Sequence, residues 1–447
     1  MSAPKYFRGE WLEPGERGYA SAGSVFNLLH ADLRPAVIAR CLGNTDVMAA
    51  LSYACEHGLP VAVRATGFSL AGFSATTGVT VDLSAMRSVR IDPSTRTAWV
   101  GGGVTGGDLA IEGHRYGLAG AVGALSSTGM GLVLGGGMGP LADRTGFASD
   151  SVLAVEVVTA SGEVVIASRD EEPELFWAIR GAGANFGVVT ALKLQLHEVP
   201  ETMAAGWVTW RPERMREALK NFRERAVSTS DDMHMLNVVG PEELQLWISH
   251  FGTESEAEAE VARLLKDCPP DEDHRSRMPF RDLLHLYDDD FPPQRTTMLE
   301  EAFPEVTDEM IDAVLDAIRA PLPAGSAAVR QIEVSVRRGA LTAVPEVPSV
   351  VHPTSSDPVW AVLPGTWWQD PSEDELHRSW LQETLAAVRP AGTVGGRLVP
   401  SMVGVPSSKE VVDRVYGDQL ERLQALKRIW DPENVFGGNL AIEGTSS

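Results

Sequence analysis

The first half of the chain alternates short apolar runs with helical spacing. From residue 35 to 200, β-branched runs bounded by glycine, proline or polar residues predict strands. Helical periodicity, with Asn44 or Thr45 as a possible N-cap for the first helix, predicts three helices between them. The expected strands are Val61–Ala65, Val79–Leu83, Thr97–Val100, Leu153–Thr159 and Val164–Ser168, and the expected helices are Asp46–His57, Asp108–Tyr116 and Leu175–Ile179.

The second half groups its patterns differently, because strands are followed by helices in blocks. This order favours an antiparallel sheet covered by helices on one face. The tail is expected to form one helix that opens with a capping box at Ser407–Glu410 and ends before Asp431. The expected strands are Ala205–Trp210, Leu244–Phe251, Val329–Val336 and Val359–Trp367, and the helices are Pro212–Ala226, Glu254–Leu265, Thr307–Arg319 and Asp374–Val388.

Composition narrows the class of protein. A chain of 447 residues suits two or three domains, and a net charge of −23 argues against nucleic acid or anionic lipid as a partner. Three cysteines without metal-ligand spacing indicate a reduced compartment and no metal site. With no leader-like segment and no membrane-length apolar run, we expect a cytoplasmic protein that binds a small molecule. Its oligomeric state stays open.

Glycine is concentrated in loops that follow strands. The stretch Arg64–Ser74 follows a strand directly, and its small residues let backbone N–H groups approach an anion. On local evidence an ordinary tight loop is equally favoured, and the Gly-x-Gly-x-x-Gly pattern of dinucleotide-binding helices is absent there. Three more stretches, at residues 101–107, 126–139 and 181–189, repeat the feature. Together they favour a backbone that lies along a large flat ligand.

The order of these motifs resembles the berberine bridge enzyme-like oxidases of the vanillyl alcohol oxidase / p-cresol methylhydroxylase (PCMH) superfamily. The resemblance runs from the glycine stretches through Leu175–Thr190 to the tail segment Asp431–Phe436, so it covers residues 35–442. It implies an α+β, two-domain PCMH-type FAD-binding fold with a substrate domain built on an antiparallel sheet covered by helices. The implied parts are residues 1–202 for FAD, 203–403 for substrate, and 404–447 completing the FAD-binding domain.

The resemblance also implies which residues contact FAD. The loop after the first strand would hold the pyrophosphate, the 126–136 stretch would line the flavin and ribityl chain, and residues 187–189 would lie by the adenine. Asn439 would approach the pyrimidine edge of the flavin. The full set is Arg64, Ala65, Thr66, Gly67, Phe68, Ser69, Gly72, Ser126, Thr128, Gly129, Gly131, Gly135, Gly136, Gly187, Val188, Val189 and Asn439.

The sequence departs from the family at the covalent anchors of the flavin. Many members attach FAD through a histidine, and that position is Phe68, which has no nucleophile. A second anchor, a cysteine in the stretch matching 121–128, is also missing. We therefore expect non-covalent FAD.

A third departure concerns the catalytic base. Where many members carry Tyr-x-Asn, this chain has Leu398-Val399-Pro400, which offers no side chain able to take a proton. Glu333 is the best single candidate for the base, because it alternates with Gln331, Ser335 and Arg337 on one face of a strand. A solvated strand face is the favoured alternative for that row.

Other polar and aromatic features have ordinary explanations beside functional ones. His250, at the end of an apolar strand, is expected to be structural. Trp367 and Trp368 either line a pocket for an aromatic substrate or belong to the core. The run Asp288–Asp290 is expected to be a solvated loop and not a metal site.

These observations leave three hypotheses for function. The leading one is a FAD-dependent oxidoreductase that oxidises a small or medium organic molecule in specialised metabolism by hydride transfer, with O2 as acceptor. The alternative is a non-redox cyclase or pericyclase on the same fold, with FAD structural or absent. A binding protein without catalysis ranks last, because the pyrophosphate loop is intact.

Overall fold

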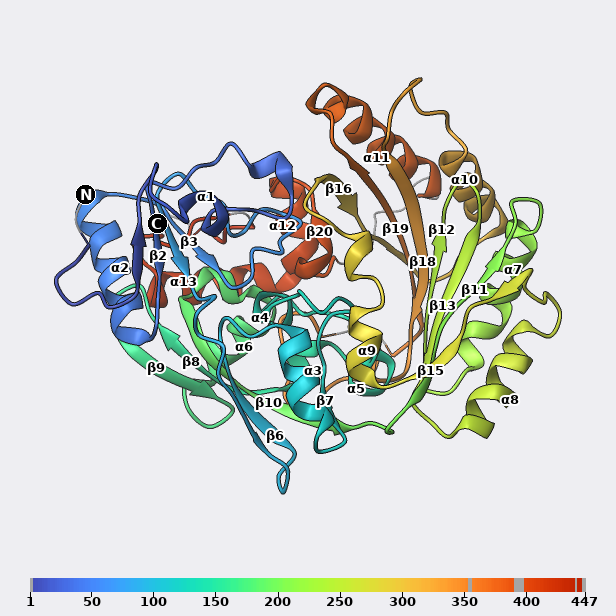
Figure 1. The fold of residues 1–447 in the computed structure, drawn as a ribbon, viewed down its shortest axis with the longest axis horizontal. Coiled ribbons are helices and arrows are strands. Elements are labelled where there is room, and N and C mark those ends of the chain that lie inside the picture. Colours follow the sequence, from blue (N-terminus) through green and yellow to red (C-terminus); the bar gives the residue numbers. More distant parts are fainter. Residues whose placement is uncertain (1–2, 353–355, 390–397, 439, 444–447) are drawn as a thin grey trace.

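The computed structural model describes residues 3–352, 356–389, 398–438 and 440–443. Its strands form three sheets in two lobes, drawn side by side in Figure 1. Two smaller sheets make the first lobe, and a large antiparallel sheet makes the second. No helix among the described residues is long and apolar enough to cross a membrane.

The first lobe combines a mostly parallel sheet with an antiparallel one. The parallel sheet has the order β1-β2-β4-β3, and the helix α2 packs on it. The antiparallel sheet has the order β5-β6-β10-β8-β9, with β7 paired to β10. The strands are β1 Glu10–Leu12, β2 Val37–Arg40, β3 Val61–Arg64, β4 Val79–Asp82, β5 Val89–Asp92, β6 Thr97–Gly101, β7 Leu118–Gly120, β8 Val152–Val158, β9 Val164–Ser168 and β10 Val188–Glu198.

The helices of the first lobe are short and lie between these strands. One predicted cap is wrong: Asn44 lies inside the first long helix, Gly43 precedes it, and the Asn44 amide donates to Glu156 instead. The helices are α1 Tyr19–Ala22, α2 Asn44–His57, α3 Gly106–His114, α4 Met130–Leu134, α5 Ala142–Thr145 and α6 Pro173–Ala182.

The second lobe is one antiparallel sheet of order β14-β11-β13-β12-β18-β19-β16-β20, with β15 on β11 and β17 on β19. The predicted long strands are present, and the polar stretch 269–277 contributes two short edge strands. The strands are β11 Met203–Trp210, β12 Met233–Val239, β13 Leu244–His250, β14 Glu272–Asp273, β15 Ser276–Met278, β16 Arg295–Leu299, β17 Glu301–Phe303, β18 Val329–Arg337, β19 Val359–Trp368 and β20 Val403–Gly404.

Four helices cover the outer face of this sheet, as Figure 1 shows on the right. They are α7 Met215–Arg225, α8 Glu254–Leu265, α10 Asp308–Ile318 and α11 Asp374–Val388. Val334 and Trp360 pack against Phe222 and Val314 on that side. The opposite face of the sheet is turned toward the first lobe, where α9 Phe280–His285 also lies.

The tail returns to the first lobe as two helices and not as the single helix predicted. They are α12 Lys409–Tyr416 and α13 Leu420–Trp430, separated at Gly417, whose φ of 53° is left-handed. Ser408 caps α12 by accepting from Val411 N–H, so the expected capping box with Glu410 does not form. The Lys427 ammonium is buried and donates to the Asn185 and Phe436 carbonyls and to the Asp431 carboxylate.

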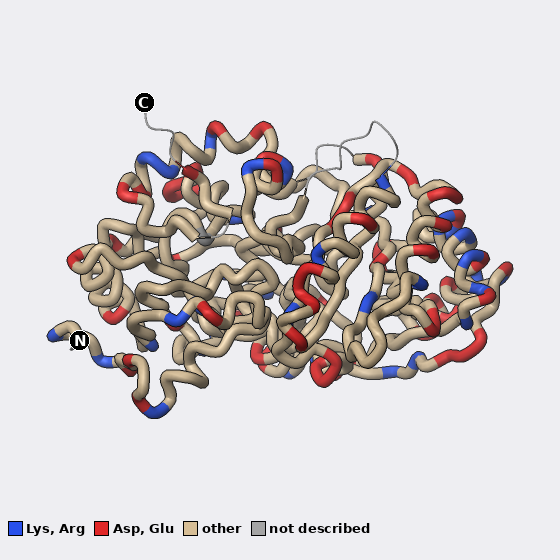
Figure 2. Tube along the Cα trace, turned by 90° about the horizontal axis from the view of Figure 1, so that it is seen from above, with Lys and Arg blue, Asp and Glu red and all other residues tan. Residues whose placement is uncertain are grey.

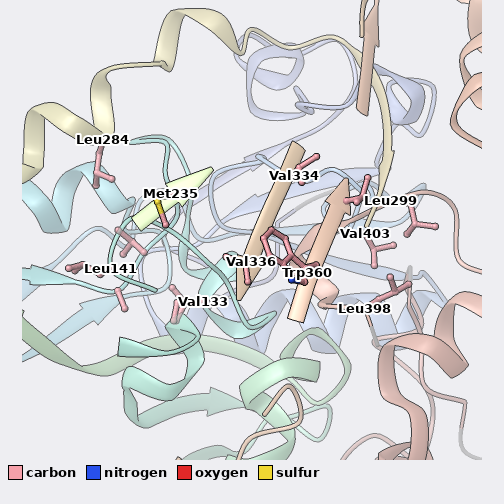
Figure 3. Close-up of a cluster of buried hydrophobic side chains, with 14 of the residues drawn as sticks. Val133, Leu141, Met235, Leu284, Leu299, Val334, Val336, Trp360, Leu398 and Val403 are labelled. Carbon is pink, nitrogen blue, oxygen red and sulfur yellow. The ribbon is translucent and has the colours of Figure 1, made fainter. Parts of the chain in front are cut away.

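The two lobes share one hydrophobic core. Figure 3 shows Val133 and Leu141 of the first lobe near Met235 and Val336 of the large sheet, and all four belong to one cluster. Charged residues are spread over outer turns and helices and are frequent on the helices of the second lobe (Figure 2). The lobes therefore meet through apolar packing, with polar groups confined to particular places along the contact.

Candidate active site

A cavity of about 390 Å³ lies between the glycine-rich loops of the first lobe and the inner face of the large sheet. This volume is in the range of small-molecule sites, about 300–1,000 Å³. The first-lobe wall includes Ala65, Thr66, Gly67, Phe68, Ser69, Thr128, Gly129, Gly131, Gly135, Gly187 and Val189 from the predicted cofactor residues.

The loop after β3 offers unpaired backbone donors to this cavity. Within the described residues, the N–H groups of Gly67, Ser69 and Leu70 have no hydrogen-bond acceptor. Gly67 has a φ of +82°, which turns the chain sharply here at no steric cost because glycine lacks a Cβ. Successive free amides in a tight turn form a concavity suited to phosphate oxygens.

Glycine also lets two loops meet at the cavity floor. A Cβ on Gly129 would lie 2.7 Å from the Thr66 side chain, so only glycine permits this approach. A Cβ on Gly131 would meet nothing within 4 Å, although Gly131 lines the cavity. Backbone at this position is therefore open to whatever occupies the cavity.

Four predicted cofactor residues lie beside the cavity and support its wall. Arg64 reaches Asp82 at 3.6 Å and lies against Gly67, and Gly72 abuts the His30 ring. Gly136, with a φ of +100°, lies between two valines, and Val188 is buried in the core of the parallel sheet.

Ser126 also lies outside the cavity wall. Its hydroxyl donates to the Asp288 carboxylate at 2.5 Å, and its N–H donates to the Leu284 carbonyl. This contact joins the 126–139 stretch to the second lobe. Asn439 lies outside the described residues.

The position expected for the histidine anchor has an aromatic environment. The Phe68 ring stacks on the Phe26 ring, with centroids 4.0 Å apart and planes 22° from parallel. Both rings line the cavity. The side chain at 68 thus contributes apolar surface and no nucleophile.

The inner face of β18 forms a polar wall. Gln331, Glu333, Ser335 and Arg337 all line the cavity, as their period-two spacing predicts, so the alternative of a solvated outer face is wrong. The Gln331 amide donates to Glu333 at 3.4 Å. Burial, with Glu300 nearby, raises the pKa of Glu333 to about 7. A carboxyl that titrates near neutrality is suited to accept or donate a proton.

A second carboxylate in this wall is not predicted from the sequence. Glu300 is buried between β16 and β17 and pairs with Arg337. The Arg337 charge is therefore engaged, which leaves Glu333 without a cation of its own. The sequence gives little indication that Glu300 belongs to a site, because it is one of two adjacent acidic residues in an apolar stretch. Glu301 turns away from the cavity and pairs with Arg389 at the end of α11 and with Arg414 in α12 of the tail.

The aromatic candidates divide between cavity and core. Trp367 lines the cavity together with Met298, Leu363 and Phe291. Trp368 points away from it, where its indole N–H donates to Asp374 and its ring stacks on His377. One tryptophan therefore provides cavity surface, and the other belongs to the packing beneath α11.

The remaining candidates are structural. His250 is buried, with Nε2 3.0 Å from Glu260 and Nδ1 accepting from Gly252 N–H, as expected for a structural histidine. Asp288–Asp290 form a single 3₁₀ turn, and Asp288 is bound to Ser126 and His285.

The segment in place of Tyr-x-Asn lies partly at the cavity. Pro400 lines it, whereas Leu398 is buried and donates its N–H to the Arg414 carbonyl. Neither residue has a side chain that can exchange a proton. This segment therefore offers the cavity no side chain for proton transfer.

Two family models match this chain. A model described as FAD binding domain matches residues 35–168, which contain β2 to β9 and the glycine-rich loops. A model described as berberine and berberine like matches residues 401–443, which contain α12 and α13.

Known proteins resemble the chain in sequence and in fold. (R)-6-hydroxynicotine oxidase of Paenarthrobacter nicotinovorans is 38% identical over 273 residues, which are 59% of each chain. A FAD-linked oxidoreductase of Dictyostelium discoideum is 27% identical across 89% of this chain and 86% of its own. The crystal structure of 6-hydroxy-D-nicotine oxidase from Arthrobacter nicotinovorans matches with a TM-score of 0.86 and 28% identity over 99% of both chains.

Together, the two lobes and the glycine-lined cavity define a flavoprotein of the PCMH type whose cofactor is FAD. The chain carries a FAD binding domain and a berberine-like C-terminal segment, and proteins similar to it in sequence and fold are FAD-linked oxidoreductases, among them berberine bridge enzyme-like and PCMH-type oxidases. The residues present fit the cofactor: the free amides of Gly67, Ser69 and Leu70 suit its pyrophosphate, and Gly129 and Gly131 leave room for backbone to lie against it.

Proposed function

We propose that this protein is a FAD-dependent oxidoreductase that oxidises a small or medium organic molecule, in specialised metabolism, with O2 as the final acceptor. Bound FAD supplies the two-electron chemistry by accepting a hydride. The observation that carries the proposal is a single cavity with an anion-receptive glycine loop on one wall and Glu333 on the other. The charge and cysteine content fit a cytoplasmic protein.

The cavity residues divide by task in this proposal. The loop 64–69 holds the pyrophosphate through backbone N–H groups. The flavin and ribityl chain lie along Thr128, Gly129 and Gly131. The adenine lies toward Gly187 and Val189. Glu333 accepts the proton that the substrate loses. Trp367 and its apolar neighbours exclude water from the substrate and favour one with an apolar or aromatic part.

We propose that FAD is held without a covalent bond. The Phe68 ring stands at the anchor position, and the stretch 121–128 contains no cysteine. Acid precipitation of the purified protein should therefore release all yellow colour into the supernatant. Flavin that remains with the washed pellet would contradict this assignment.

Anaerobic reduction of the flavin tests the oxidation itself. Loaded protein is mixed without O2 with a panel that includes 6-hydroxynicotine and xylobiose, since similar proteins are named as a 6-hydroxynicotine oxidase and a xylooligosaccharide oxidase. Bleaching of the flavin absorbance, followed by H2O2 formation when air is admitted, supports the proposal. A panel compound that is converted while the flavin stays oxidised would overturn it.

Conversion of a compound without flavin reduction would support the alternative function, a non-redox cyclase or pericyclase. One observation favours this alternative: Leu398 and Pro400 replace the expected Tyr-x-Asn, and neither side chain can exchange a proton. In that case Glu333 would act as an acid toward the substrate, and FAD would shape the cavity.

A further inference from the structure

A histidine–carboxylate pair lines the same cavity at the contact between the lobes. The Nδ1 atom of His234, on β12, lies 2.7 Å from Oδ2 of Asp143, on α5. Asp143 is almost fully buried, whereas the His234 side chain keeps 26% of its surface accessible. Both residues belong to the cavity wall.

The Asp143 carboxylate is held in place from behind. The Arg338 guanidinium is buried and lies 3.6 Å from Oδ1, the oxygen that does not face the histidine. Arg338 is itself fixed by donating to the carbonyls of Thr229, Ser230 and Met233. The carboxylate therefore has a cation on one oxygen and the imidazole on the other.

This arrangement determines which imidazole nitrogen of His234 carries the proton and which has an unshared lone pair. An ionised carboxylate only accepts hydrogen bonds, so Nδ1 of His234 must carry the proton between them. Nε2 then presents a lone pair, and no partner for it exists within the described residues. A carboxylate that orients an imidazole in this way also stabilises the imidazolium that forms when Nε2 takes a proton. His250 differs, because both of its nitrogens already have protein partners.

We propose that Nε2 of His234 is a second proton acceptor for substrate oxidation, alongside Glu333. The substrate loses the proton of an O–H or N–H group to Nε2, while the electron pair of the adjacent C–H bond leaves as hydride to the oxidised flavin. The substrate gains a C=O or C=N bond, and the imidazolium later returns its proton to water. This inference rests on the proposed oxidation and adds a residue to it.

The charges that face this pair come from three elements. Helix α5 provides Asp143 and Arg144, the segment before β12 provides Asp231 and Asp232, and the residue after β18 provides Arg338. Arg144 pairs with Asp232, and Arg338 also approaches Asp231 at 3.5 Å. A purely structural role in joining the lobes is thus the competing explanation, and the experiment must separate the two.

The first measurement is the tautomer of His234 in the FAD-loaded protein. Long-range ¹H–¹⁵N spectra at pH 8 identify the His234 signals by their loss in His234→Gln. We expect a protonated Nδ1 and a bare Nε2, with the preference weakened in Asp143→Asn, whose amide can also donate. A protonated Nε2 in the wild type would overturn the proposal.

The second measurement is the rate of anaerobic flavin reduction by whichever panel compound reduces the wild type. Because either acceptor can still take the proton when the other is lost, His234→Gln and Glu333→Gln should each slow reduction about twofold, and the double variant about 100-fold or more. Each single variant should remove one ionisation from the pH profile of this rate. The matched control is His285→Gln, because His285 also pairs through Nδ1 with an aspartate, at 2.8 Å, but outside the cavity wall.

The outcomes separate this inference from the proposed function. If His234→Gln binds FAD, adds no slowing to that of Glu333→Gln in the double variant, and leaves the pH profile unchanged, the pair only joins the lobes. Should His234→Gln fold poorly, Asp143→Asn provides the same comparison. If a panel compound is converted while the wild-type flavin stays oxidised, the oxidation fails as a proposal, and the tautomer measurement alone still confirms or refutes the bare Nε2.

Discussion

Replacing Glu333 by glutamine should change how stability depends on pH. The pKa of this carboxyl rises from 4.5 to about 7 in the folded protein, because burial and the Glu300 charge disfavour its ionised form. A group with a raised folded pKa contributes stability that is fully present below pH 4.5 and lost as pH rises through 7. At about 1.4 kcal/mol for each tenfold change in proton affinity, the loss approaches about 3 kcal/mol. Because the Glu333 side chain is only half-buried against the cavity, this is an upper limit.

Urea unfolding of the FAD-loaded protein from pH 5 to pH 9 measures the effect. Glu333→Gln cannot ionise, so its stability relative to wild type should increase from pH 5 to about pH 7 and level off above pH 8. Glu305→Gln, at an exposed position, is the control. A constant difference between Glu333→Gln and wild type at every pH would show that the cavity does not perturb this carboxyl, and would remove its electrostatic rationale as a proton acceptor.

Two further changes test the cofactor wall and the tail. Gly131→Leu should lower the ratio of flavin to protein absorbance, because a side chain at this position extends only into the cavity. Gly131→Ala, with a smaller side chain, should lower this ratio less. Full flavin occupancy in Gly131→Leu would place FAD elsewhere. Lys427→Met should destabilise the protein by about 3–5 kcal/mol in urea, since it leaves Asp431 buried without its cation. Lys409→Met removes an exposed lysine–aspartate pair of the same spacing and should cost under about 1 kcal/mol; equal losses would refute the importance of burial.

Hydrophobic periodicity predicts most of the elements here because it reflects local burial. The strand Val329–Arg337 alternates as expected, and helices such as Glu254–Leu265 and Asp374–Val388 have the predicted bounds. Periodicity does not tell which face of a strand meets solvent, because that depends on the side from which distant helices pack. For this reason the sequence leaves the row containing Glu333 between a site and a solvated face, and the structure shows that helices cover the opposite side of the sheet and this row faces the cavity.

The groups that the sequence did not reveal are pairs made by folding. His234 and Asp143 are 91 positions apart and belong to different lobes, and Glu300 meets Arg337 across strands that are not neighbours in the sheet. No spacing rule joins such residues. The glycine-rich loops could be recognised from the sequence, because each is a continuous motif. The order of these motifs along the chain indicates the family before any contact is known.

The return of the tail to the first lobe has a consequence for biogenesis. Lys427 donates to the Asn185 carbonyl, and the Ile442 N–H donates to the Asn185 side chain, so the last helices complete a layer begun some 250 residues earlier. During synthesis, Asn185 is made long before the tail, so these contacts are missing while the residues of the large sheet are synthesised. The flavin-binding lobe therefore matures last, after the ribosome has finished the segment around residue 442, and a cell short of FAD at that moment would accumulate full-length protein without its cofactor.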